Sequence, residues 1–426
     1  MDSSGGSPWR DPSVRAAVVF AGLASLAYCW LARPPFDVDG YLYWGENLAS
    51  YWRAGELQVH RTPGFPVFIA LVEALGGGQW AIMVIQCVAL AVGCGFTAAL
   101  AARVGGVRAA RVAAWLYATY LPLLSYAGSL LTEAVSVPLL LAVTELATRD
   151  DAARSPTVRR WLGWWLALAV WIRPAMAVPG ALIGLVYVLG RGPYERAFVA
   201  SGRAMRRRAV SLLVPALLLF GPFVGRNLAT LGRASPLGNV TQLNVAYGIH
   251  LPYDDELGEW SAYHRDERFF GGSRPDGFTQ EKARALDLKA TLVDNLTHHP
   301  GATLRSRVMA QLQLWGWPVT AKTEEGEPEK IPFRLLHAQH LLLLVGGLAG
   351  WWRHRRVFTV RVMALLGLAT AALHLGFHAT PRFALPVMPF LMVGLASLRR
   401  PPPSRRGAPT SPIPSLTPQG GGSDGG

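Results

Sequence analysis

The stretch WAIMVIQCVALAVGCGFTAALAA, residues 80–102, contains no charged side chain and is long enough to cross a bilayer. A helix rises about 1.5 Å per residue, so about 20 apolar residues span the hydrocarbon core. Similar windows recur through the 426-residue chain, which is 51% hydrophobic and only 16% charged. Soluble domains carry about 25% charged residues. The sequence therefore predicts an all-α, polytopic membrane protein.

About ten helices are expected to cross the bilayer on a hydropathy reading. Basic residues gather in short clusters between the apolar windows, and a cytoplasmic amino terminus puts every cluster on the cytoplasmic side, as the positive-inside rule requires. Within 161–189 both flanks are basic, so we expect a hairpin of two short helices that turns at Arg173-Pro174. The expected spans are residues 15–32, 80–102, 112–128, 129–148, a pair within 161–189, 209–225, 335–352, 361–379 and 383–398.

This topology divides the chain into regions. Residues 1–14 form a cytoplasmic N-terminus, 15–225 an N-terminal transmembrane region with a first outer loop at 33–79, 226–334 an extracytoplasmic loop, 335–398 a C-terminal transmembrane region and 399–426 a disordered cytoplasmic tail. Between 280 and 313 the leucines have helical spacing, broken by the HHPG turn at 298–301. We therefore expect a small helical cap over the outer face. The protein is expected in the cell membrane, as a multi-pass protein with both termini in the cytoplasm.

Charge and cysteine content exclude other classes. The net charge of +14 is scattered between apolar runs, and not gathered on one face or tail as nucleic-acid binding requires. The three cysteines Cys29, Cys87 and Cys94 all lie in apolar runs, so they build neither a disulfide framework nor a metal quartet. At His298-His299 the sequence shows a turn and no acid or cysteine at ligand spacing, so no metal is expected there.

Ionisable side chains converge at the outer ends of the expected helices. Charges at a membrane boundary are costly, and they usually face a cavity and pair. A carboxylate can accept a proton from an incoming hydroxyl or amine, while arginine stabilises an anionic leaving group such as phosphate. The candidate site residues are Asp37, Asp39, Tyr41, Arg61, Glu133, Arg173, Arg226, His378 and Arg382.

Several of these residues also have structural interpretations that the sequence leaves open. Asp37 and Asp39 are also typical of polar residues in a solvated loop, or of caps for a helix that begins near Tyr41. Glu133 fits a first-turn acid that complements the helix dipole. Arg173 fits a side chain that snorkels to the interface. His378 similarly fits a hydrogen-bonded histidine at a helix end.

Six short motifs, in order, resemble the membrane glycosyltransferases of the C-type fold (GT-C), in the branch of protein mannosyltransferases and bacterial aminoarabinose transferases. An acidic Asp-x-x-x-Tyr motif after the first span is the first of them. The resemblance covers roughly residues 14–398. Its motifs are Asp37-Val38-Asp39-Gly40-Tyr41 with Asn47-Leu48, then Arg61-Thr62-Pro63-Gly64-Phe65-Pro66, Thr132-Glu133, Arg173-Pro174, Pro222-Phe223-Val224-Gly225-Arg226-Asn227 with Gly232, and Pro381-Arg382-Phe383-Ala384-Leu385-Pro386.

The resemblance implies a reaction. Asp37 would be the general base that deprotonates the acceptor, and Asp39 would assist it. Arg61, Arg173, Arg226 and Arg382 would hold the donor phosphate or shape its pocket. The donor would be a sugar on a polyprenyl phosphate, used on the extracytoplasmic side in an inverting displacement.

Two residues depart from the family pattern: Val38 stands where a Glu is common, and Phe383 where a Tyr is usual. No cofactor is required by the sequence, and a divalent metal has no support in it. The partners implied are the membrane, the lipid-linked donor and a lipid, glycan or protein acceptor, with no nucleic acid. Two other functions stay open. One is a transporter or lipid flippase that uses Asp37 and Glu133 as coupling acids, and the other is a membrane accessory protein without catalysis.

Overall fold

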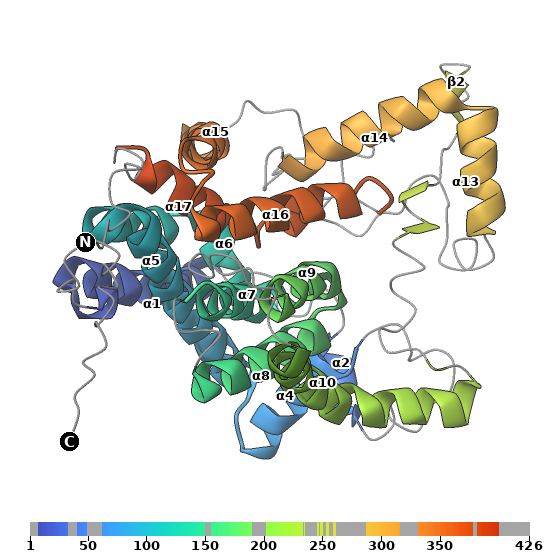
Figure 1. The fold of residues 1–426 in the computed structure, drawn as a ribbon, viewed down its shortest axis with the longest axis horizontal. Coiled ribbons are helices and arrows are strands. Elements are labelled where there is room, and N and C mark those ends of the chain that lie inside the picture. Colours follow the sequence, from blue (N-terminus) through green and yellow to red (C-terminus); the bar gives the residue numbers. More distant parts are fainter. Residues whose placement is uncertain are drawn as a thin grey trace, which may run out of the picture.

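The protein is described by a computed structural model that covers residues 7–32, 41–48, 62–149, 155–189, 202–232, 234, 245–246, 248–249, 253–254, 259–260, 287–315, 331–377 and 381–399. These residues form a helical bundle with one small antiparallel strand pair, in which Tyr253 lies opposite Trp260 (Figure 1). The elements are η1 (Pro8–Arg10), α1 (Pro12–Ala32), α2 (Tyr41–Glu46), α4 (Gly64–Ala74), α5 (Gln79–Ala118), α6 (Leu121–Leu124), η3 (Ser125–Gly128), α7 (Glu133–Ala147), α8 (Pro156–Ile172), η4 (Pro174–Met176), α9 (Ala177–Val188), α10 (Gly202–Leu231), β1 (Tyr253–Asp254), β2 (Glu259–Trp260), α13 (Leu288–Thr297), α14 (Pro300–Trp315), α15 (Ile331–Arg353), α16 (Phe358–Leu373), η6 (Pro381–Phe383) and α17 (Met388–Ser397).

Helix α5 forms the centre of the bundle, where it packs against α1, α7 and α17. Many of its buried positions carry small side chains, among them Gly93, Ala98, Ala101 and Ala110. Small residues let helix backbones approach closely, which is how helices gain packing energy inside a membrane. The three neighbouring helices thus meet along one central helix.

A break at Gly106 turns α5 into two limbs. Gly106 has φ +76°, a left-handed conformation that glycine adopts without steric cost. The second limb ends at Ala118, and the chain continues in the short elements α6 and η3. The expected continuous span at 112–128 was therefore wrong. Pro122 explains the end, because in a longer helix it would clash with the carbonyl of Ala118 and offer it no N–H donor.

Gln86 stabilises the irregular segment that follows. Its side chain is fully buried, and its Nε2 donates to the carbonyl oxygens of Ala127 and Ser129, each at 2.9 Å. Backbone carbonyls outside a helix need such partners when they are buried away from water. The amide on α5 thus replaces the helical hydrogen bonds that the segment before α7 lacks.

Helices α15 and α17 touch through glycines. A Cβ on Gly350 would overlap the backbone carbonyl of Gly394, and a Cβ on Gly347 would lie 2.7 Å from the carbonyl oxygen of Leu391. The two backbones are in direct contact, a packing that glycine alone permits. This contact positions η6, which leads into α17.

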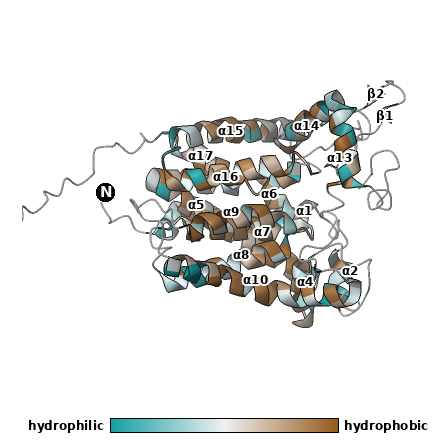
Figure 2. Cartoon of the chain, turned by 45° about the vertical axis from the view of Figure 1, so that its right-hand side comes forward, coloured by the Kyte–Doolittle hydropathy of each residue, from teal (hydrophilic) through white to brown (hydrophobic). Residues whose placement is uncertain are grey.

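The chain is a membrane protein. In the described part, three helices are long and apolar enough to cross a bilayer: Pro12–Leu31, Gln79–Ala118 and Gly202–Thr230. Large apolar side chains are exposed on these helices, among them Leu213 and Leu217 of α10. In Figure 2 the axes of the long helices are roughly aligned with one another, and α13 lies across them at one end. Helices α7, α8, α9, α16 and α17 have 15, 17, 12, 16 and 10 residues, so the number of ten crossings stays a prediction.

Other helix ends differ slightly from the expected limits. Helix α1 begins at Pro12, α10 continues to Leu231, and α15 begins at Ile331. Helices α13 and α14 lie where the leucine spacing predicts them, with the break at residues 298–299. The strands β1 and β2 were not predicted. Of the tail expected to be disordered, 399–426, all residues after 399 lie outside the described residues.

Candidate functional site

Glu133 is the first residue of α7, as the first-turn interpretation predicts, and it is completely buried. A carboxylate at a helix amino terminus is favoured by the helix dipole. Burial of a charge is nevertheless costly unless the charge is paired. The structure supplies two cations, from distant parts of the chain.

The first cation is Arg173, whose Nη1 lies 2.6 Å from Glu133 Oε1. Arg173 ends α8, and its backbone is extended at φ −136°, ψ 107°. The following Pro174 causes this, because proline disfavours helical geometry in the residue before it. The predicted turn is thus present, and it directs the arginine toward α7. Thr132 also accepts a hydrogen bond from Arg173 Nη1 at 3.2 Å.

The second cation is Arg382 of η6, whose Nε lies 3.1 Å from the same Glu133 oxygen. Its side chain is 29% exposed, whereas that of Arg173 is 6% exposed. Both guanidinium groups lie over the ring of Phe383, each with its central carbon 5.6 Å from the ring centroid. We call Glu133, Arg173, Arg382 and Phe383 the Glu133 cluster.

Counted over its four described side chains, the Glu133 cluster has one negative and two positive charges. One carboxylate faces two guanidinium groups, and arginine does not lose its charge in proteins. In the described part of the chain, the Nε–H of Arg173 is also buried without a hydrogen-bond acceptor. Buried donors normally have partners, so this one is available for a bound group. The cluster is suited to an anion such as phosphate.

A small cavity of about 20 Å³ adjoins the cluster, room for about one water molecule. Arg173, His374 and Phe383 line it together with apolar side chains of α9 and α16. His374 stacks on Phe383 with the ring centroids 5.0 Å apart, and its Nδ1–H donates to the Thr370 carbonyl at 2.7 Å. His374 was not among the predicted site residues, whereas the predicted His378 lies outside the described residues. The position of His374 four residues after Thr370, at the end of α16, was the available signal.

The remaining predicted residues either make contacts other than those of the Glu133 cluster or lie outside the described residues. Tyr41, at the start of α2, packs edge-to-face on Phe65 at 4.9 Å. Arg226 is buried in α10, and its Nη1 donates to the Asn227 side chain at 2.8 Å. Among described residues no ion pair joins Arg226 to Glu133. Asp37, Asp39, Arg61 and His378 lie outside the described residues.

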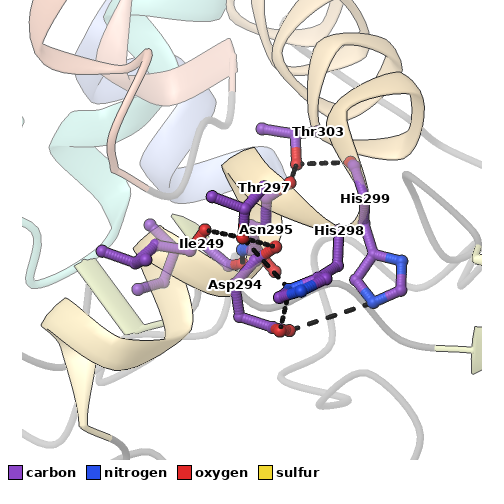
Figure 3. A network of polar contacts seen from close by, with 8 residues as sticks. Ile249, Asp294, Asn295, Thr297, His298, His299 and Thr303 are labelled. Carbon is purple, nitrogen blue, oxygen red and sulfur yellow. Dashed lines mark hydrogen bonds and ion pairs between the residues drawn. The ribbon is translucent and has the colours of Figure 1, made fainter.

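A second polar network occupies the corner between α13 and α14 (Figure 3). The Nδ1–H of His298 donates to Asp294 Oδ1 at 2.9 Å, and His299 Nε2 lies 3.9 Å from Oδ2 of the same carboxylate. Asp294 lies one helical turn before His298, so the expectation that no acid stands at ligand spacing from these histidines overlooked it. Within the described ranges, no group of three His, Cys, Asp or Glu side chains is arranged to hold a metal ion.

Comparison with known proteins gives limited similarity. Neither the protein-family models nor the curated proteins contain a match. Among solved structures, the chain is similar to the oligosaccharyltransferase of Archaeoglobus fulgidus in its complex with an inhibitory peptide and a dolichol-phosphate, with 14% identity and a TM-score of 0.46. The apo form of that enzyme has 15% sequence identity to this chain and a TM-score of 0.48. The form tethered to an acceptor peptide containing the NVT sequon has 17% identity and a TM-score of 0.47.

These alignments cover 91% of this chain and 49% to 50% of the archaeal chain. The chain therefore spans about half the length of the solved structures that it matches.

Proposed function

We propose that the protein is a membrane glycosyltransferase of the C-type fold that moves a sugar from a polyprenyl-phosphate donor to an extracytoplasmic acceptor. The observation that carries this proposal is the Glu133 cluster. Three of the six motifs, Thr132-Glu133, Arg173-Pro174 and Pro381-Arg382-Phe383, lie far apart in sequence, yet their charged side chains meet at one carboxylate. The shared excess of positive charge suits the phosphate of the donor.

The reaction is an inverting displacement at the anomeric carbon. Asp37 takes the proton of the acceptor, and the acceptor atom forms a bond to the anomeric carbon. The bond between that carbon and the phosphate oxygen breaks, and polyprenyl phosphate leaves with the electron pair. Arg173 and Arg382 stabilise the charge that develops on the leaving phosphate. Glu133 acts as a positioning residue that fixes both guanidinium groups.

The topology of the proposal follows the basic clusters. Residues 1–14 and 399–426 are cytoplasmic, and the loops 33–79 and 226–334 are extracytoplasmic. The acidic motif on 33–79 then lies on the side where the lipid-linked donor presents its sugar. Tyr41, Arg61, Arg226 and His378 complete the substrate pocket, with Asp39 next to the base.

Transfer of a labelled sugar tests the proposal. Membranes with the wild type, Asp37→Asn, Arg382→Ala or the control Arg108→Ala are incubated with labelled polyprenyl-phosphate sugars and a crude acceptor extract. Arg108 is an exposed residue of α5, distant in sequence from the cluster. We expect Asp37→Asn to lose about 10²-fold or more of the transfer rate and Arg382→Ala a similar factor, with Arg108→Ala unchanged.

Two outcomes would contradict the proposal. Transfer that survives Asp37→Asn removes the proposed base. Absence of transfer from every donor, combined with uptake of a substrate into liposomes that hold the purified protein, favours a transporter.

A further inference from the structure

Helix α14 exposes an apolar face, and polar side chains share its inward face with the buried Ala310 and Leu314. Leu304, Val308 and Leu312 follow one another at four-residue spacing on the outward face, and Leu304 and Leu312 are 68% and 61% exposed. On the inward face, Ser306 is 2% exposed. A helix on the surface of a water-soluble domain has the opposite arrangement.

The inward polar side chains hold α14 to the bundle. Arg307 donates to the carbonyl oxygens of Leu375, at 2.9 Å, and Gly248. Gln311 Nε2 donates to the carbonyl of Ala371 in α16 at 2.9 Å. The bonds to Leu375 and Ala371 satisfy backbone carbonyls at the end of α16, so the polar side chains of α14 already have partners in the bundle. Its apolar face has no such role toward the bundle.

Helix α14 also continues an apolar surface of the bundle. The Nε2–H of His340 in α15 donates to the Trp315 carbonyl at the end of α14, at 3.0 Å. Just beyond His340, α15 exposes Leu341 and Val345, and α16 exposes Leu368. Figure 2 shows α14 next to the end of α15, with α13 beyond it. The outward face of α14 is thus in line with the side chains of helices that face lipid.

The neighbouring helix α13 gives an internal comparison. It exposes Leu292 and Leu296, but also the charged Lys289 and Asp294. A helix with charges among its exposed residues is compatible with water or headgroups. In α14 Arg305 is also exposed, in the second turn from the α13 end. From such a position an arginine side chain is long enough to extend toward the membrane interface.

We propose that α14 is embedded in the bilayer, with Leu304, Val308, Met309 and Leu312 in contact with lipid acyl chains. Among the described residues, the helical cap expected at 280–313 then consists of α13 alone. The embedded helix also contacts the candidate site, because Leu314 packs with Ala384 and Phe383 of the Glu133 cluster. The inference concerns the membrane surface of the protein and holds whatever reaction the site performs.

Quenching by brominated lipid tests the contact. Single cysteines at Leu304, Val308 and Leu312 carry a bimane fluorophore in full-length protein reconstituted into phosphatidylcholine liposomes with bromine on the acyl chains. The native cysteines Cys29, Cys87 and Cys94 are buried and are replaced by alanine in all variants. The matched control is Lys289→Cys on α13. Only variants that elute as the wild type on size exclusion are used.

We expect several-fold stronger quenching at residues 304, 308 and 312 than at 289, and slow reaction of the unlabelled Val308→Cys with a charged, membrane-impermeant maleimide. Rapid maleimide reaction without quenching would overturn the proposal, because water would then cover this face. Absence of both quenching and reaction would overturn it as well, because another protein surface would then cover the helix.

Discussion

Replacement of Glu133 by glutamine removes the single carboxylate that the cluster contains. Arg173 is then left buried, with its former partner oxygen 2.6 Å away now neutral. Loss of one partner from a buried ion pair costs about 3 to 5 kcal/mol. Arg382 is 29% exposed and can turn to solvent, so its part adds at most about 1 kcal/mol. We expect Glu133→Gln to lower the free energy of unfolding by about 3 to 5 kcal/mol.

A second substitution, at Arg173, should restore part of the lost stability, whereas additive effects would lower the stability further. In Glu133→Gln/Arg173→Met the buried cation is removed together with its partner, and Arg382 keeps access to solvent. The double variant should therefore be more stable than Glu133→Gln alone, by about 2 kcal/mol. The exposed Arg108→Gln serves as a surface control, with an expected change within about 0.5 kcal/mol.

Unfolding in mixed micelles with increasing sodium dodecyl sulfate, followed by tryptophan fluorescence, measures these differences. Each variant is compared at equal protein and lipid concentration. A double variant that is as unstable as Glu133→Gln alone, or less stable than it, would refute the buried ion pair. A Glu133→Gln protein as stable as the wild type would refute it as well.

Two further predictions concern other contacts. Gly350→Ala should destabilise the protein by about 1 to 3 kcal/mol, because the added Cβ would overlap the backbone of Gly394. In the control Gly221→Ala the added Cβ meets nothing within 4 Å, so stability should not change. The same micelle titration measures both variants. The bond from Arg111 lowers the pKa of Asp11. Its stabilising effect is therefore present above the unfolded pKa of about 3.9 and lost as pH falls through the lower folded value. In the wild type, backbone hydrogen exchange at residues 8–14 should become faster at acid pH. In Asp11→Asn it should be fast at every pH. If the wild type and the variant exchanged at the same rate across the pH range, the reasoning would be wrong.

The sequence predicted the parts of the site that depend on local chemistry. Arg173 precedes a proline, which fixes an extended backbone, and Glu133 begins a helix. Both can be read from neighbouring residues. That Arg382 meets the same carboxylate depends on how η6 docks against α7 and α8, and neither a local pattern nor the motif resemblance predicted this contact.

Other features could not be predicted because they depend on tertiary contacts. Leucine spacing located α14, but the same spacing fits a helix that turns its apolar face toward a core or toward lipid. Only the polar contacts of Arg307 and Gln311 with α16 identify the inward face. The break after Ala118 had a local signal in Pro122, whereas the support from Gln86 had none.

The order in which the cluster assembles has a consequence for biosynthesis. Glu133 and Arg173 leave the ribosome early, while Arg382 follows roughly half a chain later, which at ordinary translation speeds is a delay of tens of seconds. Until then one anion faces one cation, and the pair is neutral. The excess positive charge arises only when η6 docks. An unfinished or C-terminally truncated chain would thus be inserted in the membrane without acquiring an attraction for anionic lipids at this position.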